Sequence, residues 1–269
     1  MTAIALTIAG SDPSGGAGIQ ADLKTFHQHG VYGTAVITLL TVQSTQGVVR
    51  VEVMPGELVG AQLDHLLADL TPGAAKTGAL GSAEVVRAVA ERAKRFTFPL
   101  VVDPVMISKH GHALISDEAR EALARELLPR CTLVTPNLPE ASALTRRPVG
   151  TLEQAKDAAK ALADLGPRAV LVKGGHLTGD ASDVLWFDGQ VMVLHAPRID
   201  SPHTHGTGCT YSAAIVAGLA LGVALPVAVE RAKHWLTEAI KTPPKVGQGI
   251  GPVNHFAPSP YGEAGDRAT

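Results

Sequence analysis

Short apolar runs that alternate with amphipathic helical patterns constrain the fold of this chain more than any other feature. Continuous apolar strands separated by helices predict a mostly parallel sheet with helices on both faces, because right-handed crossovers place the helices there. The runs are bounded by Gly, Pro or Asn, as is typical of buried strands. They cover residues 3–10, 35–42, 99–105, 132–137 and 169–175.

Between these runs, apolar residues recur at the i, i+3, i+4, i+7 spacing of a helix that packs one face against a core. The stripes are Leu63, Leu66, Leu67 and Leu70; Val86, Val89, Ala90 and Ala93; and Ala155, Ala158, Ala159 and Leu162, the last behind a capping box from Thr151 to Gln154. Asp188-Gly189 lies between two β-rich runs in 183–196 and predicts a hairpin on one side of the sheet. We expect one domain over residues 1–258 and a disordered polar tail over 259–269.

Composition excludes several classes of function. With 269 residues and 45% hydrophobic content, the chain can bury a large core. The 23 basic and 25 acidic residues give a net charge of −2 without a basic block, so nucleic acid is not an expected partner. No apolar run approaches the roughly 20 residues of a membrane span. Cys131 and Cys209 lack metal-type spacing, and the start of the chain lacks a secretory pattern, so we expect a reduced, cytoplasmic protein.

Polar residues follow each predicted strand. They are residues 10–18, residues 43–47, Asp103, Asn137 with Glu140, and the Lys173 to His176 segment. Each cluster alone has a structural explanation, since Asp and Asn start turns and an acidic residue favours a helix N-terminus. Together they lie at the carboxyl ends of parallel strands, where such sheets bind ligands. The sequence therefore predicts a binding site on this edge.

The N-terminal glycine loop fits neither of two common nucleotide motifs. A Walker A loop requires Gly-Lys-Ser/Thr, which "GSDPSGGA" lacks. Residues 16–21 satisfy the dinucleotide pattern in its Gly/Ala form, but the next strand ends at Gln43 without the acidic residue that holds a ribose hydroxyl. A nicotinamide-dependent oxidoreductase is therefore a distant alternative, and the glycines could serve only a tight turn.

The segment "HGTGC", residues 205–209, predicts an anion site. Gly206 and Gly208 leave backbone N–H groups unobstructed, and an apolar helix follows whose positive end points at the loop. A thiol in the first helical turn is expected to have a lowered pKa, so Cys209 is a candidate proton acceptor. The alternative is a small buried cysteine that fills a gap. We interpret His203 and His205 as neutral loop histidines and not as a pair of metal ligands, because no third ligand accompanies them at a useful spacing.

Several long segments resemble, in order, the motifs of the hydroxymethylpyrimidine/phosphomethylpyrimidine kinases. They are "GSDPSGGAGIQADLKTF", "KTGALGS", "VVDPVM", "TPNLPEA", "VKGGH" and "HGTGCT". The resemblance runs from about residue 3 to about residue 256. It implies a ribokinase-like three-layer α/β sandwich, ATP with Mg²⁺, and a homodimer. The implied reaction is phosphorylation of 4-amino-5-hydroxymethyl-2-methylpyrimidine to the monophosphate and then the diphosphate in thiamin biosynthesis.

The resemblance also implies roles for individual residues. Gln43 matches the pyrimidine-contacting glutamine, and a carboxamide suits that role because it offers both a donor and an acceptor. The positions that border the pyrimidine pocket are matched by Gly10, Asp22 and Val105. The anion hole is matched by Gly206, Thr207, Gly208 and Cys209, with Cys209 where most of the superfamily carries a catalytic aspartate.

The remaining matches concern the nucleotide and its metal. Asp103 and Glu140 match acidic positions near Mg²⁺ and the triphosphate, and carboxylates suit a cation that keeps several waters and also binds phosphates. Asn137 and Lys173 match the nucleotide side, where the lysine neutralises phosphate charge. The second phosphorylation brings two phosphates together, and Lys109 in the 107–112 loop is a candidate for offsetting their repulsion.

The chain departs from the family pattern at a few positions. Ser44 stands where asparagine is usual, Ala79 where methionine is frequent, and Gln248 and Ile250 vary within the glycine-rich 246–256 segment. These departures leave the pocket details and the adenine contacts open. Pyridoxal kinases of a cysteine-type branch share much of this motif set and are the main alternative. A non-catalytic relative that only binds pyrimidines or pyridoxal is a further one.

Overall fold

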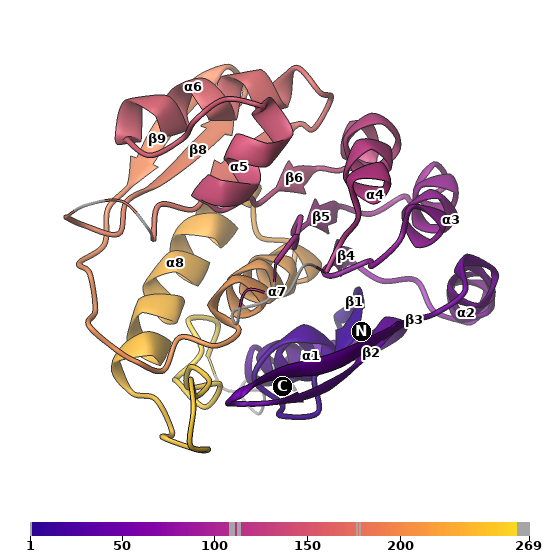
Figure 1. Ribbon diagram of the computed structural model, residues 1–269, viewed down its shortest axis with the longest axis horizontal. Helices are drawn as coiled ribbons and strands as arrows, with labels where there is room; N and C mark the ends of the chain where they lie inside the picture. The colour runs from indigo at the N-terminus through magenta and orange to yellow at the C-terminus, as the bar shows by residue number, and fades with distance from the viewer. Residues whose placement is uncertain (1, 108–110, 112–113, 176, 178, 263–269) are drawn as a thin grey trace.

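In the part of the chain that the structure describes, nine strands form one sheet through the middle of the molecule (Figure 1). The computed structural model describes residues 2–107, 111, 114–175, 177 and 179–262. The strands are β1 (Ile4–Ser11), β2 (Tyr32–Ser44), β3 (Gly47–Val53), β4 (Ala74–Thr77), β5 (Leu100–Val102), β6 (Leu133–Val134), β7 (Ala169–Val172), β8 (Asp183–Phe187) and β9 (Gln190–Leu194). Their order across the sheet is β3-β2-β1-β4-β5-β6-β7-β8-β9.

The six central strands, from β2 to β7, are parallel, and a hairpin closes each edge of the sheet. β3 pairs antiparallel with β2, and β8 and β9 continue antiparallel from β7. In the β8–β9 turn, Asp188 and Gly189 have φ values of 50° and 77°. A two-residue turn of this kind requires positive φ at both positions. The predicted parallel sheet and this hairpin are confirmed.

Two strands escaped the sequence prediction for physical reasons. β3 lies at the edge of the sheet and leaves side chains such as Val49 exposed, so it does not form the continuous apolar run of a buried strand. β4 has only four residues, and Lys76 interrupts its apolar pattern although its side chain is fully buried. Only the ion pair described below explains how that lysine is accommodated in the core.

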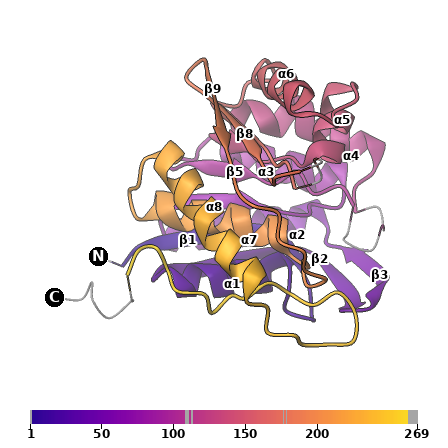
Figure 2. The ribbon, with the colours of Figure 1, turned by 90° about the vertical axis from the view of Figure 1, so that its left-hand side faces the viewer.

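Helices cover both faces of the sheet (Figures 1 and 2). One layer contains α2 (Gly56–Asp69), α3 (Ala83–Ala93), α4 (Asp117–Ala122), α5 (Leu138–Thr145) and α6 (Leu152–Ala163), with short π and 3₁₀ turns at Leu123–Leu127 and Leu128–Arg130 after α4. The other contains α1 (Gly18–Gln28), α7 (Thr207–Ala220) and α8 (Leu225–Lys241). Each layer has its own apolar cluster against the sheet, and Leu6 and Ala5 of β1 point to opposite clusters. The predicted three-layer sandwich is confirmed.

The predicted helical stripes pack as expected, with one difference. The α3 and α6 stripes are buried throughout, and Thr151 and Gln154 form the predicted capping box. In α2, Leu63 is buried and Leu66 is partly buried, whereas Leu70 follows the helix as its C-cap residue. Thus the α2 stripe is a residue shorter than its spacing suggested.

The folded part of the chain extends into the segment expected to be disordered. The Tyr261 ring lies 5.4 Å from that of His29 in an edge-on arrangement, and Arg231 stacks over it. Tyr261 thus packs against α1 and α8, residues 263–269 lie outside the described part, and a disordered tail over 259–269 stays a prediction. One domain over residues 1–258 likewise stays a prediction. Among the described helices, none has the length and apolarity needed to span a bilayer.

Candidate active site

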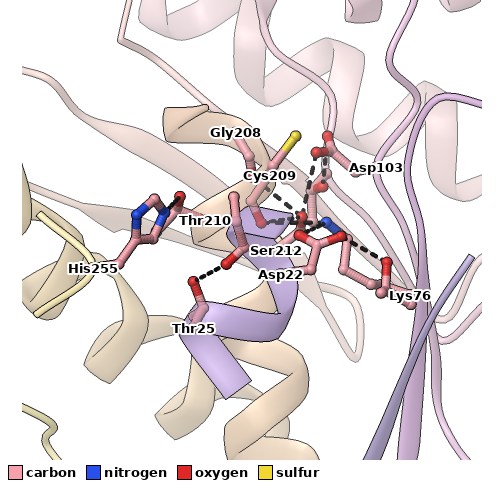
Figure 3. Close-up of polar contacts among 12 residues, drawn as sticks. Asp22, Thr25, Lys76, Asp103, Gly208, Cys209, Thr210, Ser212 and His255 are labelled. Atoms are coloured by element: carbon pink, nitrogen blue, oxygen red, sulfur yellow. Dashed lines mark hydrogen bonds and ion pairs between the residues drawn. The ribbon is translucent and has the colours of Figure 1, made fainter. Parts of the chain in front are cut away.

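Two glycine loops and three strand ends meet at the edge of the sheet predicted to bind a ligand. Because β1, β5, β6 and β7 are parallel, the loops that follow them lie on the same edge. The first turns of α1 and α7 adjoin these loops, as the contact between Gly206 and Gly16 described below requires. Figure 3 shows the polar residues that line and support the first turn of α7.

Asp12 organises the first glycine loop. Its carboxylate accepts backbone N–H bonds from Ser14 at 2.8 Å and Ala17 at 2.9 Å, and the Ser14 hydroxyl at 2.9 Å. His205 Nε2 lies 2.7 Å from the same carboxylate and links this loop to the second one. Burial opposes ionisation, but the hydrogen bonds from His205 and Ser14 lower the pKa of Asp12. Asp12 is therefore a buried, ionised carboxylate that joins both loops.

Backbone contact explains the glycine at position 206. Gly206 is the N-cap of α7 with φ at 73°, and a Cβ there would lie 1.7 Å from the carbonyl oxygen of Gly16. A side chain would therefore push the two loops apart. The first turn of α7 contains Thr207, Gly208 and Cys209. Because the first turn of a helix lacks intrahelical acceptors for its N–H groups, this turn is suited to binding an anion.

Cys209 lies where the two helix starts meet, but its acidity differs from the prediction. The backbone N–H of Gly18 donates a hydrogen bond to its sulfur. Burial raises the pKa of the Cys209 thiol to about 11, and Lys76 only partly opposes this effect. Asp22 and Asp103 add to the rise because their negative charges disfavour a thiolate. The expectation of a lowered pKa is therefore wrong: burial and nearby carboxylates outweigh the helix start.

A buried ion pair supports the turn that carries Cys209. Lys76 Nζ lies 2.6 Å from Asp22 Oδ1, and neither side chain has any exposed surface. Thr7 donates to the other carboxylate oxygen at 2.6 Å, and Lys76 also donates to the Cys209 carbonyl at 3.2 Å. Although burial alone would lower it, Asp22 raises the pKa of Lys76. In Figure 3 the Cys209 carbonyl faces this pair while its sulfur points away.

The structure shows the surroundings of two predicted pocket residues and adds one residue to the candidate site. Asp22 was expected to border the pyrimidine pocket; its side chain is completely buried in the ion pair with Lys76, beneath the first turn of α7, and its place in a pocket stays a prediction. Gly10 is also buried, with Leu39 occupying the space a Cβ would need. Lys76 was not predicted as a site residue. A lysine inside an apolar strand was the available signal, because lysines are rarely buried unless they are paired.

A second ion pair lies beside the anion-binding turn. Lys173 Nζ contacts Asp103 Oδ1 at 2.8 Å, and a Cβ on Gly208 would lie 3.3 Å from the same nitrogen. The other carboxylate oxygen of Asp103 accepts from Ser212 of α7 at 3.3 Å. Burial opposes the ionised form, but Lys173 lowers the pKa of Asp103. Lys173 and Asp103, which follow different strands, thus lie together beside the first turn of α7.

Asn137 and Glu140 form a capping box at the start of α5. Each side chain accepts the other's backbone N–H, at 2.8 Å for Asn137 Oδ1 and 2.7 Å for Glu140 Oε2. Burial raises the pKa of Glu140 to about 7, Lys173 opposes the rise, and Asp103 adds to it. Both residues therefore have a structural role at the helix start, as the local explanation of the sequence allowed. Their proximity to Lys173 and Asp103 keeps them within the candidate site.

Gln43 is the penultimate residue of β2 and lies beside His205. Its side-chain nitrogen lies 3.2 Å from His205 Nε2, and the residue is partly exposed, as is Val105 beyond β5. The turn after β2 contacts the glycine-rich 246–256 segment, because the Ile250 N–H donates to the Thr45 carbonyl at 2.9 Å. Gln46 donates to Gln248 at 3.2 Å. These departures from the family pattern therefore lie next to the predicted pyrimidine-contacting residue. Lys109 and His176 lie outside the described residues.

Comparison with known proteins identifies the relatives of this chain. The family model described as phosphomethylpyrimidine kinase matches residues 12–254. The hydroxymethylpyrimidine/phosphomethylpyrimidine kinase of Rhizobium meliloti is 51% identical over 260 residues, which cover 95% of this chain and 98% of the relative. A crystal structure of phosphomethylpyrimidine kinase from Clostridium difficile has a TM-score of 0.78 and 42% identity, covering 88% of this chain and 99% of that one.

Pyridoxal kinases are also structurally similar. The structure of the Staphylococcus aureus pyridoxal kinase in complex with AMP-PCP and pyridoxal has a TM-score of 0.87 and 36% identity. The match covers 96% of this chain and 95% of that chain. These similarities confirm the predicted ribokinase-like fold. They also favour a kinase over the oxidoreductase alternative.

Removing one partner of the buried ion pair should destabilise the protein strongly. We expect Lys76→Met to lower the free energy of unfolding by about 3–5 kcal/mol, because it leaves Asp22 buried without compensation. The double replacement Asp22→Asn with Lys76→Met should recover most of that loss. Urea denaturation at pH 7.5 measures the difference, with Lys160→Met on the exposed face of α6 as the control. Equal destabilisation of the single and double variants would contradict the pairing.

Glu140 should make stability depend on pH. Its folded pKa of about 7 exceeds the ordinary value of 4.5, so the neutral side chain stabilises the fold fully below about pH 4.5. That contribution is lost as the pH rises through 7. Glu140→Gln keeps the capping oxygen but cannot ionise, so from pH 5 to pH 8 it should gain up to about 3 kcal/mol relative to wild type. Urea denaturation across this range tests the effect, with exposed Glu57→Gln as the control. Parallel curves would show that Glu140 does not titrate there.

Proposed function

The chain belongs to the phosphomethylpyrimidine kinase family, and we propose that it phosphorylates 4-amino-5-hydroxymethyl-2-methylpyrimidine and then its monophosphate with ATP, in thiamin biosynthesis. The observation that carries this proposal is the convergence of an anion-binding helix start, Lys173 and Gln43 on one edge of the sheet. A phosphoryl-transfer enzyme requires these elements: a site for phosphate charge next to a residue that recognises the acceptor.

The α7 turn and Lys173 form the proposed phosphate site. Backbone N–H groups of Gly208 and Cys209 stabilise the charge of the transferred group, because they are fixed in position before the reaction. The Thr207 N–H donates to the Thr204 carbonyl at 3.4 Å and maintains the loop. Lys173 lies within reach of the same turn, since a Cβ on Gly208 would contact its ammonium group. Asp103 holds this ammonium at 2.8 Å and keeps it directed at the site. Phosphoryl transfer depends mainly on such positioning and charge stabilisation.

Asp103 and Glu140 are the residues proposed to hold Mg²⁺, and their chemistry fits a hydrated ion. Both are carboxylates close enough for one to raise the pKa of the other. Both oxygens of Asp103 already accept hydrogen bonds, which favours contact with the metal through water. Mg²⁺ usually keeps several waters and binds phosphate oxygens directly. When bound, it would neutralise charge on the triphosphate, while Glu140 ionises and Asn137 maintains the helix start.

The acceptor site is proposed to lie between Gln43 and Cys209. Gln43 is partly exposed at the end of β2 and carries both a donor and an acceptor for a heterocycle. Cys209 lies at the start of α7, next to the proposed position of the transferred phosphoryl group. With a pKa of about 11, its thiol is protonated at neutral pH. A loose transition state requires little proton removal before bond formation, so a weakly acidic thiol is compatible with the reaction.

Pyridoxal phosphorylation is the second candidate function. The similarity to a pyridoxal kinase over nearly the whole of both chains favours it. Gln43 can form hydrogen bonds with either heterocycle, because both carry ring nitrogens. The family resemblance further supports a homodimer, a cytoplasmic location and the absence of a nucleic-acid partner, and we propose these properties together with the function. Sedimentation equilibrium tests the dimer.

Substrate preference should depend on Gln43. We expect a higher kcat/KM for the hydroxymethylpyrimidine than for pyridoxal in an ATP-coupled assay. Gln43→Leu should weaken pyrimidine binding by about 1–3 kcal/mol, because buried polar groups of the substrate lose their partner. Binding of ATP should be unchanged. Ser44→Ala, the adjacent exposed residue, is the matched control. A higher kcat/KM for pyridoxal would replace the proposed function with the second candidate.

The pH dependence of catalysis should reveal the role of Cys209. If its sulfur accepts the hydroxymethyl proton, the single-turnover rate should rise about tenfold per pH unit from pH 7 towards 10, because its pKa is about 11. Cys209→Asp should remove this rise, and Cys209→Ala should lose about 100-fold in rate. Rapid-quench measurements across this range give the profiles. A flat wild-type profile, with an alanine variant within about threefold of it, would assign the thiol to packing.

A further inference from the structure

His205 contacts both the loop carboxylate Asp12 and the proposed substrate-reading residue Gln43 through one ring nitrogen. His205 Nε2 lies 2.7 Å from Asp12 Oδ2 and 3.2 Å from the side-chain nitrogen of Gln43. Histidine and aspartate are both buried, at 3% exposure each, so water does not compete effectively for these contacts. Whether His205 Nε2 carries a proton therefore determines whether the Gln43 side chain accepts a hydrogen bond from it or donates one to it.

The contact with Asp12 requires that His205 Nε2 carries a proton. The Asp12 carboxylate accepts hydrogen bonds from two backbone N–H groups and the Ser14 hydroxyl, which stabilise its ionised form. Burial opposes ionisation, but hydrogen bonds from His205 and Ser14 lower the pKa of Asp12. An ionised carboxylate can only accept a hydrogen bond, so the imidazole must donate. This holds whether His205 is neutral or doubly protonated.

A protonated Nε2 also determines the orientation of the Gln43 carboxamide. If the amide nitrogen of Gln43 faced His205, two donors would meet at 3.2 Å. The nitrogen and oxygen of a glutamine side chain exchange places on rotation by 180°, and their assignment follows from the hydrogen-bond network. With the oxygen towards His205, the Nε2–H that donates to Asp12 meets a second, more distant acceptor in place of a donor, and the amide NH₂ group turns away from the histidine.

We propose that His205, held by Asp12, is a positioning residue that turns the NH₂ group of Gln43 towards the substrate, so that the site selects a heterocycle with a hydrogen-bond acceptor. The inference rests on the proposed function, because it takes Gln43 as the substrate-reading residue. The ring nitrogen beside the amino group of an aminopyrimidine is such an acceptor, whereas the amino group itself is a donor. The carboxamide therefore reads primarily the ring nitrogen.

Binding measurements with two analogues test this orientation. One analogue of 4-amino-5-hydroxymethyl-2-methylpyrimidine replaces the ring nitrogen beside the amino group by CH, and the other lacks the amino group. In wild type, calorimetric titration should show binding about 10- to 100-fold weaker for the first analogue, because the amide donor is left unpaired. The affinity for the analogue that lacks the amino group should fall by less than about fivefold, since no buried protein group loses its only partner.

Variants of His205 test whether it fixes the orientation. In His205→Leu the carboxamide of Gln43 is free to turn, so the affinities for the two analogues should differ by less than about threefold. His205→Gln can still donate an amide N–H to Asp12 and should restore the difference. His203→Leu, which changes the neighbouring loop histidine, is the matched control and should behave as wild type. A purely structural role would weaken all ligands equally and leave the difference unchanged.

An independent measurement uses the wild-type protein alone. The side-chain amide resonance of Gln43, assigned by its loss in Gln43→Leu, should shift when the pyrimidine binds and remain unshifted with the CH analogue. The inference would be overturned if the analogue without the amino group lost more affinity than the CH analogue. It would also be overturned if a folded His205→Leu variant kept the full wild-type difference in affinity between the two analogues. Either result would leave the proposed function intact. Failure of the wild-type protein to bind the pyrimidine would overturn both.

Discussion

The buried ion pair between Asp22 and Lys76 is the interaction on which the candidate site depends. It joins α1 to β4, and Lys76 extends to the carbonyl of Cys209 in the first turn of α7. Two charges without solvent contact are tolerated only when each is paired and hydrogen-bonded, which makes their geometry specific. Three elements that are distant in sequence are therefore fixed relative to one another directly beneath the anion-binding turn (Figure 3).

Above this pair, the two glycine loops are joined by contacts that only small residues permit. The Gly206 and Gly16 backbones touch, and Asp12 with His205 bonds the loops side chain to side chain. The first loop contributes Gly18, whose N–H reaches the Cys209 sulfur. The groups proposed to bind the ligand and to accept a proton are thus held in place before a ligand arrives, which reduces the ordering required on binding. The proposed substrate-reading residue, Gln43, is attached to the same assembly through His205.

Much of the fold could be predicted from the sequence because the relevant information is local. The strand runs, the α6 capping box and the Asp188-Gly189 hairpin each depend on neighbouring residues, and each is present. β4 was missed because its lysine is compatible with a strand only through a partner 54 residues away. Within the site, residues that follow strands were placed together correctly, since parallel strands bring their carboxyl ends to one edge.

The sequence by itself determined the layer architecture, the position of the ligand edge and the family, because hydrophobic periodicity and ordered motifs are carried by contiguous residues. Tertiary structure alone decided the electrostatic state of the site residues. Asp22 is fully buried beneath the first turn of α7 in its pair with Lys76, and burial raises the pKa of Cys209 to about 11 where the helix start alone suggested the opposite. The physical reason is that a pKa and a hydrogen-bond orientation depend on desolvation and on charges contributed by other segments, which no local pattern specifies.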